Sequence, residues 1–348
     1  MDLSNFDSLF LNQIQKNKSE VNMQTVENKS TKRTILVTGC AGFIGSHLSE
    51  KLLLLGYKVI GIDNFDPFYP RNIKEENMNP FFQNSSFTFH ELDLRIDSSL
   101  DIIEDPIDLV VHLAGKAGVR PSIEDPQGYI DSNITATRNV LDFMRKKGIK
   151  KLAFASSSSV YGNNKEVPFS ENHNVDRAIS PYAFSKKSCE VLNHSYHHLY
   201  DLDIINMRFF TVFGPRQRPD LAIHKFLKLF RNKQPIPMFG DGSTARDYTF
   251  VDDTVEGIVK SCSYLFNHEQ VFETINLGNS YPILLRHMIE IIAKNAECEP
   301  KINHLPMQAG DVEQTYADIS RAKELIGYNP QVSFEEGIKR FITWFDNQ

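Results

Sequence analysis

The segment ILVTGCAGFIG at residues 35–45 places the strongest constraint on the fold. It joins a short apolar run to three glycines, Gly39, Gly42 and Gly45, and an apolar pattern with helical spacing follows until Gly56. This order predicts a buried strand, a tight turn and a helix. A helix that begins at such a turn directs free N–H groups and a positive dipole end toward the turn, so we expect a phosphate to bind there.

A second apolar run, at residues 58–62, ends at Asp63, 18 residues after Gly45. An acid at this place can accept a hydrogen bond from a ribose 2′-hydroxyl, which favours NAD over NADP. A glycine turn alone would also suit an ordinary strand–helix corner. The turn and the acid together predict a dinucleotide site.

The remaining pattern alternates strands with helices. We predict strands at 87–92, 108–113, 151–155 and 203–210, and helices at 133–147 and 182–200. Such alternation predicts an α/β fold with a Rossmann-like, doubly wound parallel sheet. Proline and glycine become frequent from about residue 211, so a smaller C-terminal α/β domain is expected there. We predict that the polar residues 1–31 form a flexible tail, or alternatively a docking segment.

Charge and cysteine spacing exclude several classes of function. The 348 residues carry a net charge of −6, which gives no basic footprint for nucleic acid. No apolar run approaches the roughly 18 residues of a membrane span. The four cysteines show no metal-binding spacing, so we expect free thiols, no metal and a cytoplasmic protein.

A second pattern carries chemistry. Tyr182 and Lys186 are four residues apart on a predicted helix and therefore share one face. A phenol titrates near ~10, so it serves as a base at neutral pH only if nearby positive charge stabilises its anion. Lys186 and a positively charged nicotinamide are suited to this. Ser157, in a run of four serines that ends a predicted strand, can relay a proton to Tyr182.

Several longer motifs occur in a fixed order: TGCAGFIGSH at 38–47, SSSSVYG at 156–162, SPYAFSK at 180–186, RFFTVFGPRQRPD at 208–220 and FGDGSTARDYTFVDD at 239–253. In these motifs the chain resembles the extended short-chain dehydrogenase/reductase family, and specifically its nucleotide-sugar epimerases. The resemblance runs from about residue 33 to the C-terminus. It implies an NAD-binding domain at 32–210, completed by part of 249–277, and a mainly UDP-sugar-binding domain at 211–348.

The resemblance implies NAD-dependent C4 epimerisation of a UDP-sugar through a 4-keto intermediate. Tyr182 would be the base, Ser157 the relay, and Lys186 would hold the nicotinamide ribose. UDP-glucuronate, converted to UDP-galacturonate, is the expected substrate, and UDP-glucose or UDP-N-acetylglucosamine is the alternative. Decarboxylases and 4,6-dehydratases of the family carry acids where this chain has Ser158 and Ser159, so those reactions are less favoured. A homodimer through the helices at 133–147 and 182–200 is also implied.

The family's binding positions transfer to this sequence residue by residue. Besides Tyr182 and Lys186, the expected NAD-binding residues are Gly39, Gly42, Phe43, Ile44, Gly45, Asp63, Asn64, Asp93, Leu94, Leu113, Ala114, Gly115, Lys116, Asn133 and Ala155. The expected substrate-binding residues are Arg120, Ser157, Ser158, Ser159, Tyr182, Thr211, Arg218, Ala222, Phe239, Arg246 and Asp311. The hydroxyl groups and Arg218 would hold the carboxylate of a uronic acid.

Overall fold

The computed structural model describes residues 32–306 and 312–348. The predicted tail at 1–31 and the predicted ligand Asp311 lie outside the described residues. Residues 33–348 form one compact unit.

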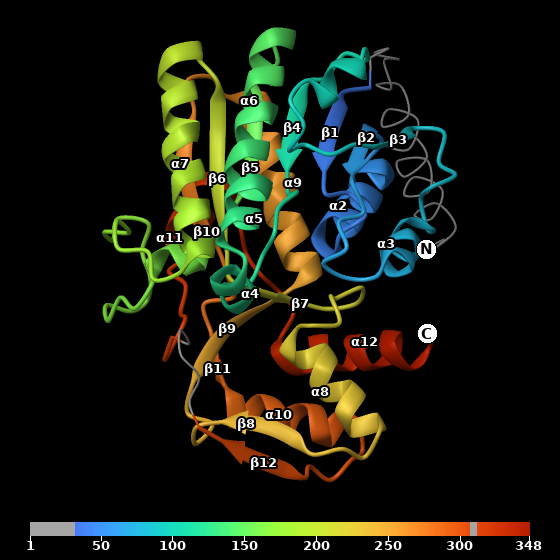
Figure 1. Cartoon of the computed structure of the whole chain (residues 1–348), viewed down its shortest axis with the longest axis vertical. Helices are drawn as coiled ribbons and strands as arrows, with labels where there is room; N and C mark the ends of the chain where they lie inside the picture. The colour runs from blue at the N-terminus through green and yellow to red at the C-terminus, as the bar shows by residue number, and fades with distance from the viewer. Residues whose placement is uncertain (1–31, 307–311) are drawn as a thin grey trace, which may run out of the picture. The chain divides into compact units, whose positions relative to one another are not determined.

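A seven-stranded parallel sheet forms the centre of the unit (Figure 1). Its strands lie in the order β10 (Phe272–Leu277), β6 (Asp203–Phe209), β5 (Lys151–Ser157), β4 (Leu109–His112), β1 (Thr34–Thr38), β2 (Lys58–Asp63) and β3 (Phe87–Glu91). The order reverses between β1 and β4, since β2 and β3 lie on one side and β5 and β6 on the other. The predicted Rossmann-like sheet is therefore confirmed, and a ligand crevice is expected at this switch point.

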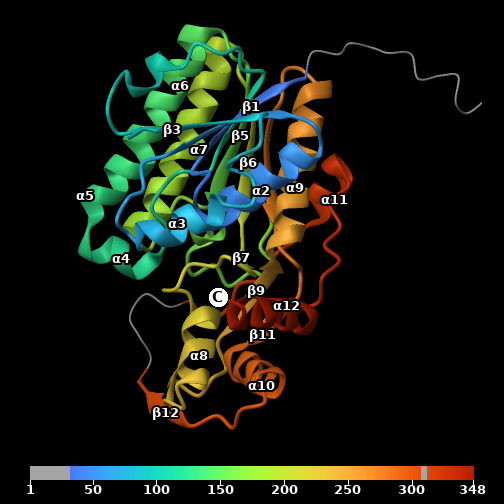
Figure 2. The ribbon, with the colours of Figure 1, turned by 90° about the vertical axis from the view of Figure 1, so that its right-hand side faces the viewer.

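Both faces of the sheet are covered, as expected for parallel strands. Ile35 and Val37 of β1 belong to the core cluster that includes α2 (Phe43–Leu54) and α9 (Val251–Asn267). Leu36, which points to the opposite face, belongs to the cluster that includes α6 (Ala136–Lys147) and α7 (Pro181–Tyr200). Figure 2 shows these two helix layers on either side of the sheet. The period-two alternation of one strand thus builds both cores.

The second lobe combines short strands and helices from the C-terminal part of the chain (Figure 1). Its strands are β7 (Thr211–Phe213), β9 (Ala245–Phe250) and β11 (Pro282–Leu284) in one sheet and β8 (Ile236–Phe239) and β12 (Ile302–Leu305) in the other. Its helices are α8 (Ala222–Arg231), α10 (Leu285–Asn295) and α12 (Phe334–Asp346). Between β9 and β11 the chain returns to the main sheet as α9 and β10. The domain division near residue 210 stays a prediction.

Local signals placed most elements correctly and missed short ones. The predicted helix at 133–147 begins instead as a π-helical turn, Ile130–Thr135, before α6. Ser333 caps α12 by accepting from the Glu336 N–H. The short helices α3 (Arg71–Met78), α4 (Val119–Glu124), α5 (Pro126–Tyr129) and α11 (Ser320–Ile326) lack a periodic pattern long enough to predict.

Candidate active site

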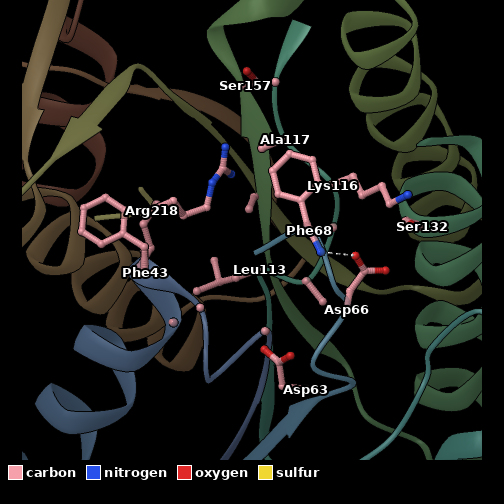
Figure 3. Close-up of a pocket in the computed structure, with 18 of the residues that line it drawn as sticks. Phe43, Asp63, Asp66, Phe68, Leu113, Lys116, Ala117, Ser132, Ser157 and Arg218 are labelled. Carbon is pink, nitrogen blue, oxygen red and sulfur yellow. Dashed lines mark hydrogen bonds between the residues drawn. The ribbon is translucent and has the colours of Figure 1, made fainter. Parts of the chain in front are cut away.

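A cavity of about 420 Å³ lies at the carboxyl edge of the sheet, at the switch point between β1 and β4. Asp63 and Ser157 lie at opposite ends of the view in Figure 3. The predicted cofactor residues that line this cavity are Gly39, Gly42, Phe43, Ile44, Gly45, Asp63, Asn64, Asp93, Leu94, Leu113, Ala114, Gly115, Lys116, Ala155, Tyr182 and Lys186. The predicted substrate residues that line it are Ser157, Ser158, Tyr182, Thr211 and Arg218.

The glycine turn forms a cradle that side chains would fill. Gly39 has φ +73°, and a Cβ there would lie 2.9 Å from the Ala114 nitrogen. A Cβ on Gly45 would lie 2.0 Å from the Gly39 oxygen. Gly42 is the N-cap of α2 and supplies no side-chain acceptor to the helix. The first N–H groups of α2 therefore suit a phosphate ligand, and the cradle fits the pyrophosphate of a dinucleotide.

Asp63 ends β2 and is buried at one end of the cavity. Its Oδ1 accepts the Phe65 N–H at 2.8 Å and lies 3.4 Å from Lys74 Nζ. Lys74, which is also buried and lines the cavity, was not predicted. It comes from α3, whose short pattern gave no signal, and its charge balances that of the buried carboxylate.

The loop after β2 contributes further residues that sequence reasoning missed. Asp63, Asn64 and Asp66 each accept a hydrogen bond from the N–H two residues later. These successive Asx turns direct Phe68 and Tyr69 into the cavity lining. The only available sequence signal was the repeated Asp/Asn spacing, which predicts the turns but not the direction of the rings.

The chemical residues meet at the other end of the cavity. Ser157 is the last residue of β5, and its hydroxyl lies near enough to the Tyr182 phenol on α7 to lower the pKa of that phenol. Ser159 Oγ donates to Ser157 Oγ at 2.9 Å. One turn after Tyr182, the buried Lys186 donates from Nζ to the Ala155 oxygen at 2.8 Å. The structure thus brings the predicted Tyr, Lys and Ser together.

Electrostatics at this end depend on burial. Burial raises the pKa of the Tyr182 phenol, while the Ser157 hydrogen bond and the Arg218 charge act in the opposite direction. Burial also lowers the pKa of Lys186, against the attraction of Cys189 and Glu190. The phenol alone is therefore protonated at neutral pH, and an additional cation beside it is needed to make it a base.

Arg218 extends into the cavity from the loop before α8 (Figure 3). Its Nε and Nη2 donate to the Asp220 carboxylate at 3.0 and 2.9 Å, and its guanidinium lies 5.0 Å from the Phe68 ring centroid. Phe68 lies in the loop after β2, so this contact joins the two lobes across the cavity. A guanidinium held in this way is suited to a carboxylate ligand.

Carboxylates are confined to the Asp63 end of the cavity lining. Asp63 is paired with Lys74, and Asp66 and Asp93 lie 3.8 and 2.6 Å from Arg95. Among the described lining residues, the Ser157 end therefore has hydroxyl groups, a phenol and two cations but no acidic side chain.

Six predicted residues do not line the cavity: Asn133, Arg120, Ser159, Ala222, Phe239 and Arg246. Asn133 acts from behind, since its Oδ1 accepts the Lys116 N–H at 2.8 Å. The Arg120 guanidinium lies 5.5 Å from the Phe239 ring centroid, which joins α4 to β8. Arg246 donates from Nη1 to the Ala245 oxygen at 2.8 Å.

Residues 32–306 and 312–348 contain no group of three or more histidine, cysteine, aspartate or glutamate side chains that could hold a metal ion. None of their helices is both long and apolar enough to cross a membrane.

The family model described as GDP-mannose 4,6 dehydratase matches residues 36–341. The chain belongs to this family. It is thus an extended short-chain dehydrogenase/reductase of the nucleotide-sugar epimerase type, as its motifs predicted.

Individual members of the family match over most of their length. The UDP-glucuronate 4-epimerase of Thermodesulfobacterium geofontis is 43% identical over 89% of this chain and 95% of the relative. The structure of UDP-glucuronic acid 4-epimerase from Bacillus cereus with UDP-glucuronic acid and NAD has a TM-score of 0.85 and 36% identity, covering 90% and 99% of the two chains. The UDP-N-acetylglucosamine 4-epimerase of Methanobrevibacter ruminantium, with UDP-N-acetylmuramic acid, has a TM-score of 0.82 and 32% identity, covering 91% and 99%.

Proposed function

We propose that the chain is an NAD-dependent isomerase that interconverts UDP-glucuronate and UDP-galacturonate by epimerisation at C4 of the sugar. The observation that carries this is one cavity that combines the glycine cradle, the Tyr182–Ser157–Lys186 set and Arg218. A C4 epimerase needs a cofactor, a base and a grip on the substrate in one enclosed place. The activity of the Thermodesulfobacterium relative supports the proposal.

The cofactor end of the cavity is suited to NAD. The glycine cradle and the first turn of α2 would hold the pyrophosphate, and Asp63 the adenosine ribose. Lys186 would hold the nicotinamide ribose at the other end. NAD, when bound, supplies the hydride acceptor and later the hydride donor. Its positive nicotinamide would also be the cation that Tyr182 needs in order to ionise.

Proton transfer belongs to Tyr182 and Ser157. The phenolate would take the proton of the sugar 4-hydroxyl while C4 is oxidised to a ketone, and the Ser157 hydroxyl would relay it. When C4 is reduced from its other face, Tyr182 would return the same proton to the oxygen. The residues therefore end the cycle in their starting state, with no net redox change.

The uronic acid carboxylate would be bound by Arg218 with the hydroxyl groups of Ser158, Ser159 and Thr211. Ser158 and Thr211 line the cavity beside Tyr182. Among the described lining residues no acidic side chain lies at this end, and the nearby Asp220 carboxylate is paired with Arg218. We propose that this grip holds the carboxylate of the 4-keto sugar out of line for loss of carbon dioxide.

The UDP group would be anchored in the second lobe. The residues proposed for this are Arg120, Ala222, Phe239, Arg246 and Asp311. The contact between Arg120 and Phe239 supports a role for both lobes in this anchor.

The test is incubation of the purified protein with UDP-glucuronate, UDP-glucose or UDP-N-acetylglucosamine in separate reactions, with products identified by NMR. We expect UDP-galacturonate from the first and little turnover of the other two. Faster epimerisation of a neutral sugar would reassign the substrate. Loss of carbon dioxide from UDP-glucuronate, or no turnover of any of the three, would overturn the proposal.

We propose that two copies of the chain associate through α7, one of the two helices predicted to form the dimer interface. Phe184, Val191 and Leu199 lie on one face of this helix and are 49%, 56% and 63% exposed. Val191→Lys should produce a monomer in sedimentation experiments, whereas Leu54→Lys, which replaces an apolar side chain exposed elsewhere, should not. A Val191→Lys variant that sediments like the wild-type protein would contradict this interface.

We also propose a cytoplasmic location. Cys40, Cys189, Cys262 and Cys298 are all free thiols. Unpaired cysteines are typical of a reducing compartment. Fractionation of cells that express the chain would test this location.

A further inference from the structure

A buried chain of hydrogen bonds lies behind the cavity. His112 is the last residue of β4 and is 1% exposed. Its Nδ1 lies 2.6 Å from Thr38 Oγ1, and its Nε2 lies 3.1 Å from Thr137 Oγ1. Thr38 ends β1 directly before Gly39, and Thr137 lies in the first turn of α6. The imidazole thus connects the strand that leads into the glycine turn with a helix on one face of the sheet.

The hydroxyl of Thr137 determines which ring nitrogen carries the proton. This hydroxyl donates to the Asn133 carbonyl oxygen at 2.5 Å, and a carbonyl oxygen can only accept. Since a hydroxyl has a single proton, Thr137 Oγ1 can only accept from His112. The histidine therefore bears its proton on Nε2.

The other side of the ring follows by the same reasoning. Burial, with a smaller effect of the Lys186 charge, lowers the pKa of His112 to about 3, so the ring is neutral at neutral pH. Its Nδ1 is then bare and accepts the Thr38 hydroxyl proton. Thr38 Oγ1 in turn accepts the Ala114 N–H at 3.1 Å. The hydrogen bonds therefore run in one direction, from the Ala114 N–H to Thr38, from Thr38 to His112, and from His112 through Thr137 to the Asn133 carbonyl oxygen.

Beyond Thr137 and Asn133, the buried hydrogen bonds continue to α7, the helix that carries Tyr182. The Asn133 carboxamide accepts the Lys116 N–H at 2.8 Å and donates to Ser185 Oγ at 2.8 Å. The Ser185 hydroxyl donates to the Tyr182 backbone oxygen at 2.8 Å. The loop at 114–116 and the helix that carries Tyr182 are therefore attached to the same buried network.

We propose that His112, as the neutral Nε2–H form, is a positioning residue that aligns the two cofactor-binding turns with the catalytic helix. Ala114 forms the wall of the cradle opposite Gly39, and its N–H is fixed by Thr38. A shift of this wall would loosen the cofactor and move it relative to Tyr182. The inference rests on the proposed function for its catalytic consequence, but the tautomer and the cofactor retention can be measured without it.

The tautomer is tested by nitrogen NMR of the full protein with isotope-labelled histidine, with the His112 signals assigned by their loss in His112→Gln. We expect one protonated and one bare ring nitrogen. The protonated nitrogen should be Nε2, which donates to the Thr137 hydroxyl. The signals should not change between about pH 5 and about pH 9. A proton on Nδ1, or a ring that titrates in this range, would overturn the proposal.

The coupling is tested by the matched pair Thr137→Val and Thr137→Ser. Valine keeps the volume and removes the acceptor, whereas serine keeps the hydroxyl. We expect Thr137→Val to release NAD about tenfold faster than the wild-type protein, the size of effect of one buried hydrogen bond, and to lower kcat with little change in the KM for the UDP-sugar. Thr137→Ser should release NAD at a rate within about twofold of wild type.

Equal rates of NAD release from the two variants would overturn the positioning role of His112. Packing, and not the hydrogen bond, would then account for cofactor retention. If Thr137→Val fails to fold, Thr38→Val and Thr38→Ser give the same comparison from the other side of the ring. A protein that turns over none of the UDP-sugars would refute the proposed function, yet its histidine spectrum and NAD release would still decide the role of His112.

Discussion

The two ends of the cavity are constructed in different ways. At the cofactor end, backbone turns do most of the positioning, and the glycines at 39 and 45 leave space that a single Cβ would close. At the Ser157 end, side chains from distant segments converge: Ser157 from β5, Tyr182 from α7 and Arg218 from the loop before α8. Backbone geometry is encoded locally, whereas convergence of side chains depends on the whole fold. The following variants test this contrast, from the largest expected effect to the smallest.

Tyr182→Phe should have the largest effect, because it removes the proposed base without disturbing the structure at either end of the cavity. We expect turnover to fall on the order of a thousandfold. NAD content and thermal stability should stay close to those of the wild-type protein, since burial of the ring is kept. A variant with a near-normal rate in the NMR assay would refute the assignment of the base.

Gly45→Ala tests the backbone-built end. The added Cβ would lie 2.0 Å from the Gly39 oxygen, so the turn must open. We expect NAD affinity, measured by fluorescence titration, to fall by about a hundredfold. Gly56→Ala is the matched control, because a Cβ there meets nothing within 4 Å. Its cost comes only from the left-handed φ of +87°, which strains the alanine backbone. Its NAD affinity should be unchanged, at a stability cost of about 1 kcal/mol. Similar affinities in both variants would contradict the cradle.

Arg218→Gln tests the side-chain-built end. Loss of a charge-assisted contact should lower kcat/KM for UDP-glucuronate about thirtyfold. UDP-glucose, which has no carboxylate, should be affected much less. Asp220→Asn keeps the arginine and weakens only its support, so its effect should be smaller and of the same sign. Equal losses for both sugars with Arg218→Gln would remove the carboxylate assignment.

Ser157→Ala sharpens the electrostatic part of the comparison. The Ser157 hydrogen bond lowers the pKa of Tyr182, so its loss raises that pKa. Because a base acts in its deprotonated form, the rising limb of the kcat–pH profile should move to higher pH, by about one unit for one hydrogen bond. A profile that moves to lower pH, or does not move, would contradict direct contact between these two residues during turnover.

Arg120→Met should have the smallest effect. Loss of the cation–π contact with Phe239 should raise KM for all three UDP-sugars about threefold. Arg145→Met is the control, since Arg145 lies over the Tyr200 ring, away from the cavity lining. If both variants have wild-type KM values, the proposed UDP anchor does not include Arg120.

The same contrast explains how much could be predicted from sequence. The strands and the two long helices followed from apolar runs and period, and the structure places β1, β2, β4, β5, β6 and α7 within two residues or so of the expected bounds. Glycine spacing and the i, i+4 pair Tyr182 and Lys186 are also local patterns, and nearly all the cofactor residues predicted from motifs line the cavity.

Other features had no local signal. Phe68 reaches Arg218 only because the loop after β2 folds against the lobe that begins 143 positions later, at Thr211. Lys74 is on a helix too short to predict, and its pairing with Asp63 requires that helix to pack beside β2. His112 gave no ligand spacing, and its role depends on hydroxyl groups 74 and 25 residues away in the chain.

The position of β10 has a consequence for synthesis of the chain. β10 pairs with β6 along its whole length, from Phe272 beside Ile204 to Leu277 beside Phe209, yet the second lobe interrupts the chain between them. A nascent chain that has emerged only to residue 210 would present the buried strand β6 as an open edge. The main sheet receives its last strand only after residue 277 has left the ribosome, when β7, α8, β8 and β9 of the second lobe have already emerged.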